Sequence, residues 1–160
     1  MQIAVIGAGD CSAEEYATAR TVGVLVAEGG ATLVCGGMGG VMEAACRGAR
    51  EGNGITVGIV PNTGNGNKYL DVVIRSGLGH ARNVLVVLSA EAVIAIGGKC
   101  GTLSEIAFAL KTGRPVFALG SWDIPGVVAC KNPEEAVINA LSATRQSRLC
   151  GSPPSGRESS

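Results

Sequence analysis

The sequence is poor in aromatic residues and carries no excess of charge of either sign. Phe, Trp and Tyr make up only 3% of it, so it lacks the rows of rings on which single-stranded nucleic acids stack. Thirteen Lys and Arg residues balance thirteen Asp and Glu residues, so no overall field attracts nucleic acid or an anionic membrane. We expect neither as a partner, and any recognition of a phosphate has to be local.

Long hydrophobic runs and zinc-ligand patterns are also missing. No apolar run reaches the roughly 20 residues that span a bilayer, and the opening Met1 to Val5 lacks the basic segment and cleavage site of a signal peptide. The six cysteines form no Cys-x-x-Cys pair, and the single histidine, His80, cannot build a zinc site alone. The sequence predicts a cytoplasmic protein with free thiols, no membrane contact and no metal site.

Glycine, by contrast, is abundant, with 25 residues in a chain of 160. Short hydrophobic segments alternate with segments of helical periodicity, which predicts an α/β fold. We expect a three-layer, Rossmann-like, doubly wound architecture with a mostly parallel sheet of about seven strands. Residues 1–148 are predicted to form a single Rossmann-like domain. Residues 149–160 contain mainly Ser, Pro, Gly and charged residues and are predicted to be a disordered tail.

The hydrophobic patterns also give approximate bounds for each element. Ser12 to Glu15 has the spacing of a capping box and opens the first helix. The expected helices cover 13–28, 41–50, 80–88, a segment from 102 to about 110, and a segment from 133 to about 144. The expected strands cover 2–6, 31–34, 55–60, 71–74, 92–96, 115–119 and 127–130.

Residues 92–110 combine a buried strand, a glycine-rich turn and the start of a helix. Such a junction presents free backbone N–H groups and the positive end of a helix dipole, and glycine lets an anion approach the backbone closely. The stretch therefore predicts a phosphate-binding turn. The spacing of Thr102 and Glu105 also fits a helix capping box, so Glu105 is either a cap or a catalytic acid.

A second glycine-rich turn follows the second strand and supplies the candidate ligand-binding residues Gly36, Gly37, Gly39 and Gly40. In a parallel sheet both turns open at the carboxyl edge, where open α/β sheets bind their ligands.

The first turn, Gly7-x-Gly9, resembles a dinucleotide fingerprint only weakly. Its third small position is Ser12, and the second strand ends in Cys35-Gly36, where an NAD-binding fold places a carboxylate. We do not predict NAD binding.

Arg82 falls in the first turn of the predicted helix over 80–88, where the helix dipole disfavours positive charge. An anionic partner removes this penalty, so Arg82 is a candidate ligand-binding residue, with a structural salt bridge as the alternative. The polar loop over 61–69 is either a lid or rim of the site or a plain solvated connection.

These motifs together resemble a known family. The pattern Gly98-x-x-Gly101-Thr102-x-x-Glu105 is similar to the Pro-Gly-Gly-x-Gly-Thr-x-x-Glu signature of the LOG-like (SLOG) superfamily, long mislabelled as lysine decarboxylases. That superfamily contains cytokinin-activating phosphoribohydrolases. Its second glycine turn is matched by residues 36–42, and the likeness covers about residues 3–142 in the same order. The chain most resembles the short branch that contains molybdenum cofactor carrier proteins.

The resemblance implies roles for individual residues. Arg82 and Glu105 match the pair implicated in hydrolase catalysis. Gly98, Gly101 and Thr102 match the phosphate loop.

Four departures weaken the match to the hydrolases. Gly97 replaces the signature proline, and Lys99 takes a place usually held by glycine, where it adds a point charge for a phosphate. Asn83 stands where the hydrolases carry lysine, and Ser104 replaces the first of two adjacent glutamates.

We therefore expect a protein that binds a phosphorylated small molecule, either a nucleotide or a phosphorylated pterin such as the molybdenum cofactor. The alternative is a hydrolase that cleaves nucleoside 5′-monophosphates at the N-glycosidic bond with Arg82 and Glu105. Neither hypothesis requires a further cofactor. Lysine decarboxylation is disfavoured because no lysine has a recognisable Schiff-base setting. The resemblance also implies a homodimer or a higher homo-oligomer.

Overall fold

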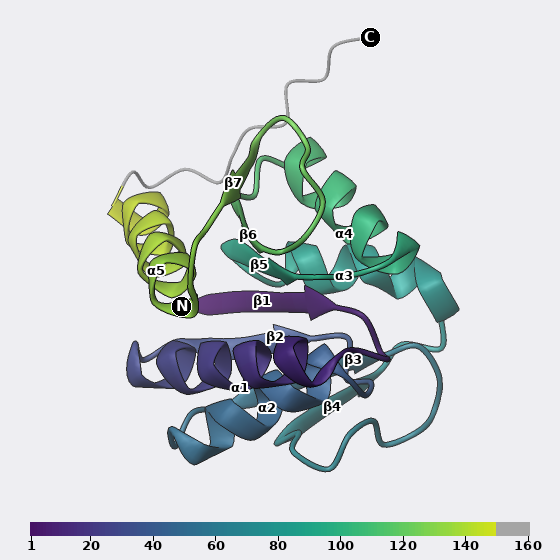
Figure 1. The fold of residues 1–160 in the computed structure, drawn as a ribbon. Helices are drawn as coiled ribbons and strands as arrows, with labels where there is room; N and C mark the ends of the chain where they lie inside the picture. Colours follow the sequence, from purple (N-terminus) through teal and green to yellow (C-terminus); the bar gives the residue numbers. More distant parts are fainter. Residues whose placement is uncertain (150–160) are drawn as a thin grey trace, which may run out of the picture.

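The computed structural model describes residues 1–149, which form a parallel sheet between two layers of helices (Figure 1). The seven strands follow the order β4-β3-β2-β1-β5-β6-β7, and every neighbouring pair is parallel. This confirms the predicted three-layer α/β fold. The strands are β1 (Gln2–Gly7), β2 (Thr32–Cys35), β3 (Thr56–Val60), β4 (Val72–Arg75), β5 (Ala92–Ile96), β6 (Val116–Leu119) and β7 (Val127–Ala129).

The helices divide between the two faces of the sheet. One face is covered by α1, α2 and α5, and the other by α3 and α4, so each face has its own buried cluster. The helical elements are α1 (Ala13–Glu28), α2 (Val41–Glu51), the short 3₁₀ helix η1 (Gly79–Arg82), α3 (Asn83–Leu88), α4 (Cys100–Lys111) and α5 (Pro133–Leu149).

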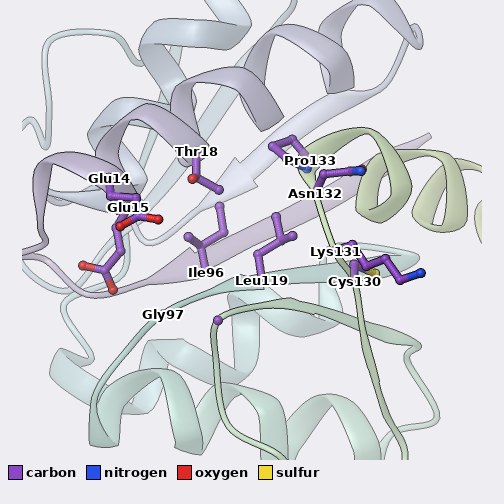
Figure 2. Close-up of a pocket in the computed structure, with 11 residues that line it drawn as sticks. Glu14, Glu15, Thr18, Ile96, Gly97, Leu119, Cys130, Lys131, Asn132 and Pro133 are labelled. Carbon is purple, nitrogen blue, oxygen red and sulfur yellow. The ribbon is translucent and has the colours of Figure 1, made fainter.

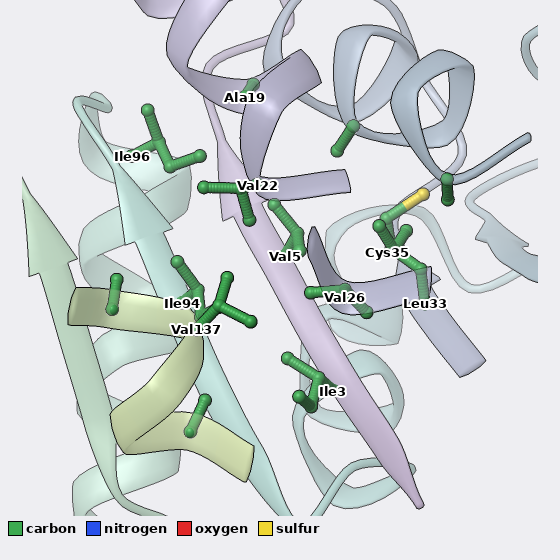
Figure 3. Packing of buried hydrophobic residues seen from close by; sticks show 14 of the residues in the cluster. Ile3, Val5, Ala19, Val22, Val26, Leu33, Cys35, Ile94, Ile96 and Val137 are labelled. Atoms are coloured by element: carbon green, nitrogen blue, oxygen red, sulfur yellow. The ribbon is translucent and has the colours of Figure 1, made fainter. Parts of the chain in front are cut away.

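Strand β1 lies in the middle of the sheet and is buried on both faces. Ile3 and Val5 belong to the cluster under α1, α2 and α5, whereas Ala4 and Ile6 belong to the cluster under α3 and α4. Figure 3 shows Val22 of α1 beside Val5 of β1 in the cluster under α1, α2 and α5. Full burial of a Val or Ile side chain contributes about 1.5–3 kcal/mol, so these alternating residues hold the central strands between both helix layers.

Helices α1 and α2 meet backbone to backbone at two glycines. A Cβ atom on Gly23 would lie 2.0 Å from the carbonyl oxygen of Ala45, and one on Gly48 would lie 1.9 Å from that of Arg20. Any larger residue at either position therefore forces the helices apart. Because α1 follows β1 and α2 follows β2, this contact fixes the turns that precede the two helices relative to each other.

Most predicted boundaries agree with the structure to within one residue, and three helices differ by more. The predicted helix over 80–88 is divided into η1 and α3, so Arg82 ends one element and directly precedes the other. Helix α4 begins at Cys100 rather than at Thr102. Helix α5 continues to Leu149 instead of ending near residue 144, and the rest of the predicted tail, 150–160, lies outside the described residues. None of the helices described over 1–149 is long and apolar enough to cross a membrane.

Candidate functional site

A pocket of about 310 Å³ lies at the carboxyl ends of the central strands. At this point the chain connections diverge, since β1 continues through α1 to β2 on one side and β5 continues through α4 to β6 on the other. Open α/β sheets bind their ligands at such a point. We call it the Arg82 pocket. Its lining residues are Gly7, Ala8, Gly9, Asp10, Met38, Met42, His80, Arg82, Asn83, Lys99, Gly101, Thr102 and Glu105.

Arg82 is a buried cation at this pocket, with only 7% of its surface exposed. Its Nη2 donates to the carbonyl oxygen of Gly36 at 3.2 Å, and its Nη1 donates to Oδ1 of Asn83. Its Nε is buried and has no hydrogen-bond partner among residues 1–149. A buried guanidinium with an unused donor has spare capacity to bind an anion.

Glu105 is the acidic counterpart of Arg82 in the pocket and is 6% exposed. Its Oε1 lies 3.7 Å from Nη1 of Arg82, which makes an ion pair without the short contact of a strong hydrogen bond. Burial raises the pKa of the Glu105 carboxyl to about 7, although Arg82 acts in the opposite direction. Burial also lowers the pKa of Arg82, and Glu105 opposes that shift. Near neutral pH, Glu105 therefore exists in both protonated and ionised forms.

Asn83 connects Arg82 to helix α4 through a chain of hydrogen bonds. Its amide oxygen accepts from Arg82, and its Nδ2 donates to Oγ of Ser104 at 3.0 Å. The Ser104 hydroxyl in turn donates to the carbonyl oxygen of Gly101 at 2.7 Å. Asn83 and Ser104 are two of the positions where the sequence departs from the hydrolase pattern, and the structure places them in direct contact.

The turn before α4 leaves the first N–H groups of that helix without a side-chain cap. The N-cap residue is Lys99, whose side chain has no acceptor, and in the described part of the chain no side-chain cap hydrogen bond is made at this helix start. Glu105 therefore does not form a capping box with Thr102, because the helix starts earlier than the sequence predicts. Uncapped N–H groups at a helix start attract anions. Gly97 has φ +51°, which proline cannot adopt because its ring holds φ near −65°.

The second glycine turn lines the Arg82 pocket through Met38 rather than through its glycines. The carbonyl oxygen of Gly36 accepts from Arg82, and that of Gly37 accepts from the backbone N–H of Asn67 at 2.8 Å. Asn67 Nδ2 also donates to the Met38 carbonyl oxygen at 3.1 Å, so the loop over 61–69 is fastened to this turn.

Gly39 and Gly40 pack against the first glycine turn. A Cβ on Gly40 would lie 2.4 Å from the carbonyl oxygen of Ala8. In this structure the second turn therefore shapes and supports the pocket.

Sequence reasoning missed part of the pocket wall. The weak dinucleotide fingerprint does not mark Gly7 to Asp10 as a site segment, yet this segment lines the Arg82 pocket together with Met42 and His80. The available signal was its position directly after a buried strand. Of the predicted site residues, Arg82, Lys99, Gly101, Thr102 and Glu105 come together in this pocket. Gly98 lines a neighbouring hollow instead.

A second pocket, of about 340 Å³, lies over the ends of β5 and β6 between the first turns of α1 and α5 (Figure 2). Glu14, Glu15 and Thr18 of α1 border it, and the Lys131 side chain points away from its centre. None of the predicted site residues is among the residues that line it.

Two thiols are buried behind the site. The Sγ atoms of Cys35 and Cys46 lie 3.4 Å apart, and Cys35 Sγ accepts from the N–H of Gly37 at 3.3 Å. The hydrogen bond from Cys46 lowers the pKa of Cys35 despite its burial. Among residues 1–149, no group of three or more His, Cys, Asp or Glu residues is arranged to hold a metal ion.

Several solved structures are similar to this chain. The molybdenum cofactor binding protein of the phototrophic bacterium Rippkaea orientalis is 37% identical, with a TM-score of 0.83, and the match covers 88% of this chain and 95% of that one. The molybdenum cofactor carrier protein of Chlamydomonas reinhardtii is 31% identical, with a TM-score of 0.83, over 90% of this chain and 98% of that one.

Sequence comparisons agree with the structural ones. An uncharacterized protein of Archaeoglobus fulgidus is 47% identical over 146 residues, which are 90% of this chain and 97% of that protein. The family model described as the SLOG cluster4 family matches residues 1–148. The predicted resemblance of the chain to the SLOG superfamily is thereby confirmed, and the chain belongs to the SLOG cluster4 family.

Proposed function

We propose that this protein binds a phosphorylated small molecule in the Arg82 pocket, with the phosphate between Arg82 and the first turn of α4. The chief support is the buried guanidinium of Arg82. Its Nε lacks a partner among residues 1–149, and its ion pair with Glu105 is long. An incoming phosphate would supply the charge-assisted hydrogen bonds that the protein leaves unmade.

The phosphate would meet further donors at the start of α4. Gly101 has open space where a Cβ would stand, so an anion could approach its backbone closely. Gly98 and Thr102 flank the same turn, and exposed Lys99 would add a mobile positive charge. Gly36 would hold Arg82 in place from the opposite side through its carbonyl oxygen.

Among phosphorylated ligands, a pterin such as the molybdenum cofactor is favoured over a simple nucleotide. Two similar structures, from Rippkaea orientalis and Chlamydomonas reinhardtii, are described as molybdenum cofactor binding and carrier proteins. The pocket is of the size that small-molecule sites usually have, about 300–1,000 Å³. The cofactor would be cargo here, and binding it requires no general acid.

A hydrolase is the second candidate because of Glu105. A carboxyl with a pKa of about 7 would be able to give and accept protons near neutral pH, as a general acid or base must. The conformation of Gly97 argues against this candidate, since the proline of the hydrolase signature would not fit its φ of +51°.

Calorimetric titration with a pterin monophosphate and with AMP tests the binding proposal. Arg82→Ala should weaken the binding of both by about tenfold or more, the usual effect of losing a charge-assisted hydrogen bond. Arg20→Ala is the matched control, because Arg20 pairs with Glu51 on the outside of α1 and α2. Equal affinities of wild type and Arg82→Ala would refute the proposal.

Chromatography of the AMP incubations separates the two functions. Release of free adenine that disappears in Glu105→Gln would establish the hydrolase. Binding without release of base would favour the carrier.

A further inference from the structure

The chain has a single tryptophan, Trp122, and its side chain is not packed in the core. Trp122 is 40% exposed and follows β6 at the carboxyl edge of the sheet. It borders a hollow of about 380 Å³, which we call the Trp122 hollow. The other residues that line it are Glu15, Gly97, Gly98, Gly120, Ser121 and Asp123. An indole ring beside a hollow at the ligand-binding edge provides a flat apolar surface for a ring system.

The Trp122 hollow and the Arg82 pocket share one turn of the chain. Gly97 and Gly98 line the hollow, whereas Lys99, Gly101 and Thr102, which follow directly, line the Arg82 pocket. A phosphate held at the start of α4 would therefore lie beside the turn that borders both spaces. The part of the ligand attached to that phosphate can extend over the turn into the hollow.

Polar groups beside Trp122 indicate which ring fits. The carboxylates of Asp123 and Glu15 both border the hollow, and an ionised carboxylate accepts hydrogen bonds only. The Glu15 carboxylate already accepts from the N–H of Ser12, which leaves Asp123 as the acceptor for a ligand. The hydroxyl oxygen of Ser121 is buried and has no hydrogen-bond partner in the part of the chain that the structure describes. Gly120, with φ +58°, leaves open space where a side chain would otherwise stand.

A carboxylate beside an aromatic ring selects a heterocycle with two adjacent N–H donors on its edge. The 2-amino-4-oxopyrimidine ring of guanine and of pterins has this edge, with a ring N–H next to an amino group. Adenine presents a ring nitrogen acceptor there, which an ionised carboxylate repels.

We propose that the Trp122 hollow binds the flat 2-amino-4-oxopyrimidine ring of the ligand whose phosphate occupies the Arg82 pocket. The ring stacks on Trp122 and its two N–H donors face Asp123. This inference rests on the proposed function for the location of the phosphate, but the ring site has its own residues and its own probes.

Fluorescence titration tests the ring site directly, because all tryptophan emission comes from Trp122. The probes are GMP, a pterin monophosphate, AMP and guanosine. GMP and the pterin should quench the emission saturably, and AMP should quench it less. The stronger of the first two identifies whether the ring is a purine or a pterin.

Two variants assign the recognition to side chains. Trp122→Leu should weaken GMP binding in calorimetry by about tenfold, the usual effect of losing a stacked ring, and Trp122→Phe should retain most of the affinity. Asp123→Asn should reduce the preference for GMP over AMP by about fivefold, the value of one net hydrogen bond. The circular dichroism of each variant should match the wild type.

Arg82→Ala and guanosine separate this inference from the proposed function. Guanosine has no phosphate, so its quenching of Trp122 should be the same in wild type and Arg82→Ala. If GMP binds without quenching Trp122 and with equal affinity in Trp122→Leu, the ring site is refuted and the phosphate site stands. If guanosine quenches but Arg82→Ala binds GMP as well as wild type does, the phosphate site fails and the ring site stands. Absence of quenching by all the probes refutes the ring site.

Discussion

Replacing Glu105 by glutamine should stabilise the protein at pH 8 but not at pH 4.5. The pKa of Glu105 is about 7 in the folded protein and 4.5 as its ordinary value, so the folded state holds this proton more tightly than the unfolded state. Stability therefore falls as pH rises from 4.5 to about 7 and stays at the lower level above it. At about 1.4 kcal/mol per pH unit, this range costs about 3 kcal/mol, which the neutral amide of the Glu105→Gln variant avoids.

Thermal unfolding at the two pH values measures this difference. For a chain of this size about 3 kcal/mol corresponds to a rise of roughly 6–12 °C in Tm at pH 8, with little change at pH 4.5. Glu28→Gln is the control, because it makes the same chemical change at an exposed residue in the last turn of α1. A Glu105→Gln variant that is less stable than wild type at pH 8 would refute the reasoning, since Arg82 would then stabilise the carboxylate more than burial destabilises it.

Three other substitutions test the architecture of the site. Gly101→Ala should raise stability by about 0.5–1 kcal/mol, because alanine favours the helix and its Cβ has open space, yet it should weaken binding of the pterin monophosphate in calorimetry. Gly48→Ala should lower the free energy of unfolding in urea by about 1–3 kcal/mol or more, because its Cβ would collide with the Arg20 carbonyl; an unchanged midpoint would contradict the close helix contact. Asn83→Ala should cost about 1–3 kcal/mol in the same assay and weaken ligand binding, because it removes the acceptor that positions Arg82; full ligand affinity would show that Gly36 and Glu105 suffice to hold Arg82.

The features that short sequence patterns predicted correctly are those set by neighbouring residues in the chain. The capping box of Ser12 and Glu15 is present, with the Glu15 N–H donating to Ser12 Oγ and the Ser12 N–H donating to the Glu15 carboxylate. Strand β5 runs from Ala92 to Ile96 as predicted, because an unbroken run of apolar residues fits a strand buried on both faces. The conflict of Arg82 with a helix dipole predicts an anionic partner, and the structure places Arg82 in a buried ion pair with Glu105 at the pocket.

Three features could not be predicted from the sequence, because no local pattern marks them. The capping interpretation of Glu105 was wrong because α4 starts at Cys100 without any side chain to mark its first turn. The contribution of Gly7 to Asp10 depends on β1 lying between β2 and β5, and no local pattern encodes that order. The link between Asn83 and Ser104 joins residues 21 positions apart, so each looked like an isolated departure.

The glycine contact between α1 and α2 limits how this protein can be redesigned. Gly23 and Gly48 lock the two helices together, and the turns before these helices form one wall of the Arg82 pocket. On that side, substitutions that enlarge the pocket for a larger ligand would have to move both helices, because a change in one displaces the other. The opposite wall comes from the start of α4 together with η1 and the six-residue helix α3, and these last two are much shorter than α1 and α2. A library intended to alter ligand choice should therefore diversify residues 78–81 and leave Arg82, Asn83 and the paired helices intact.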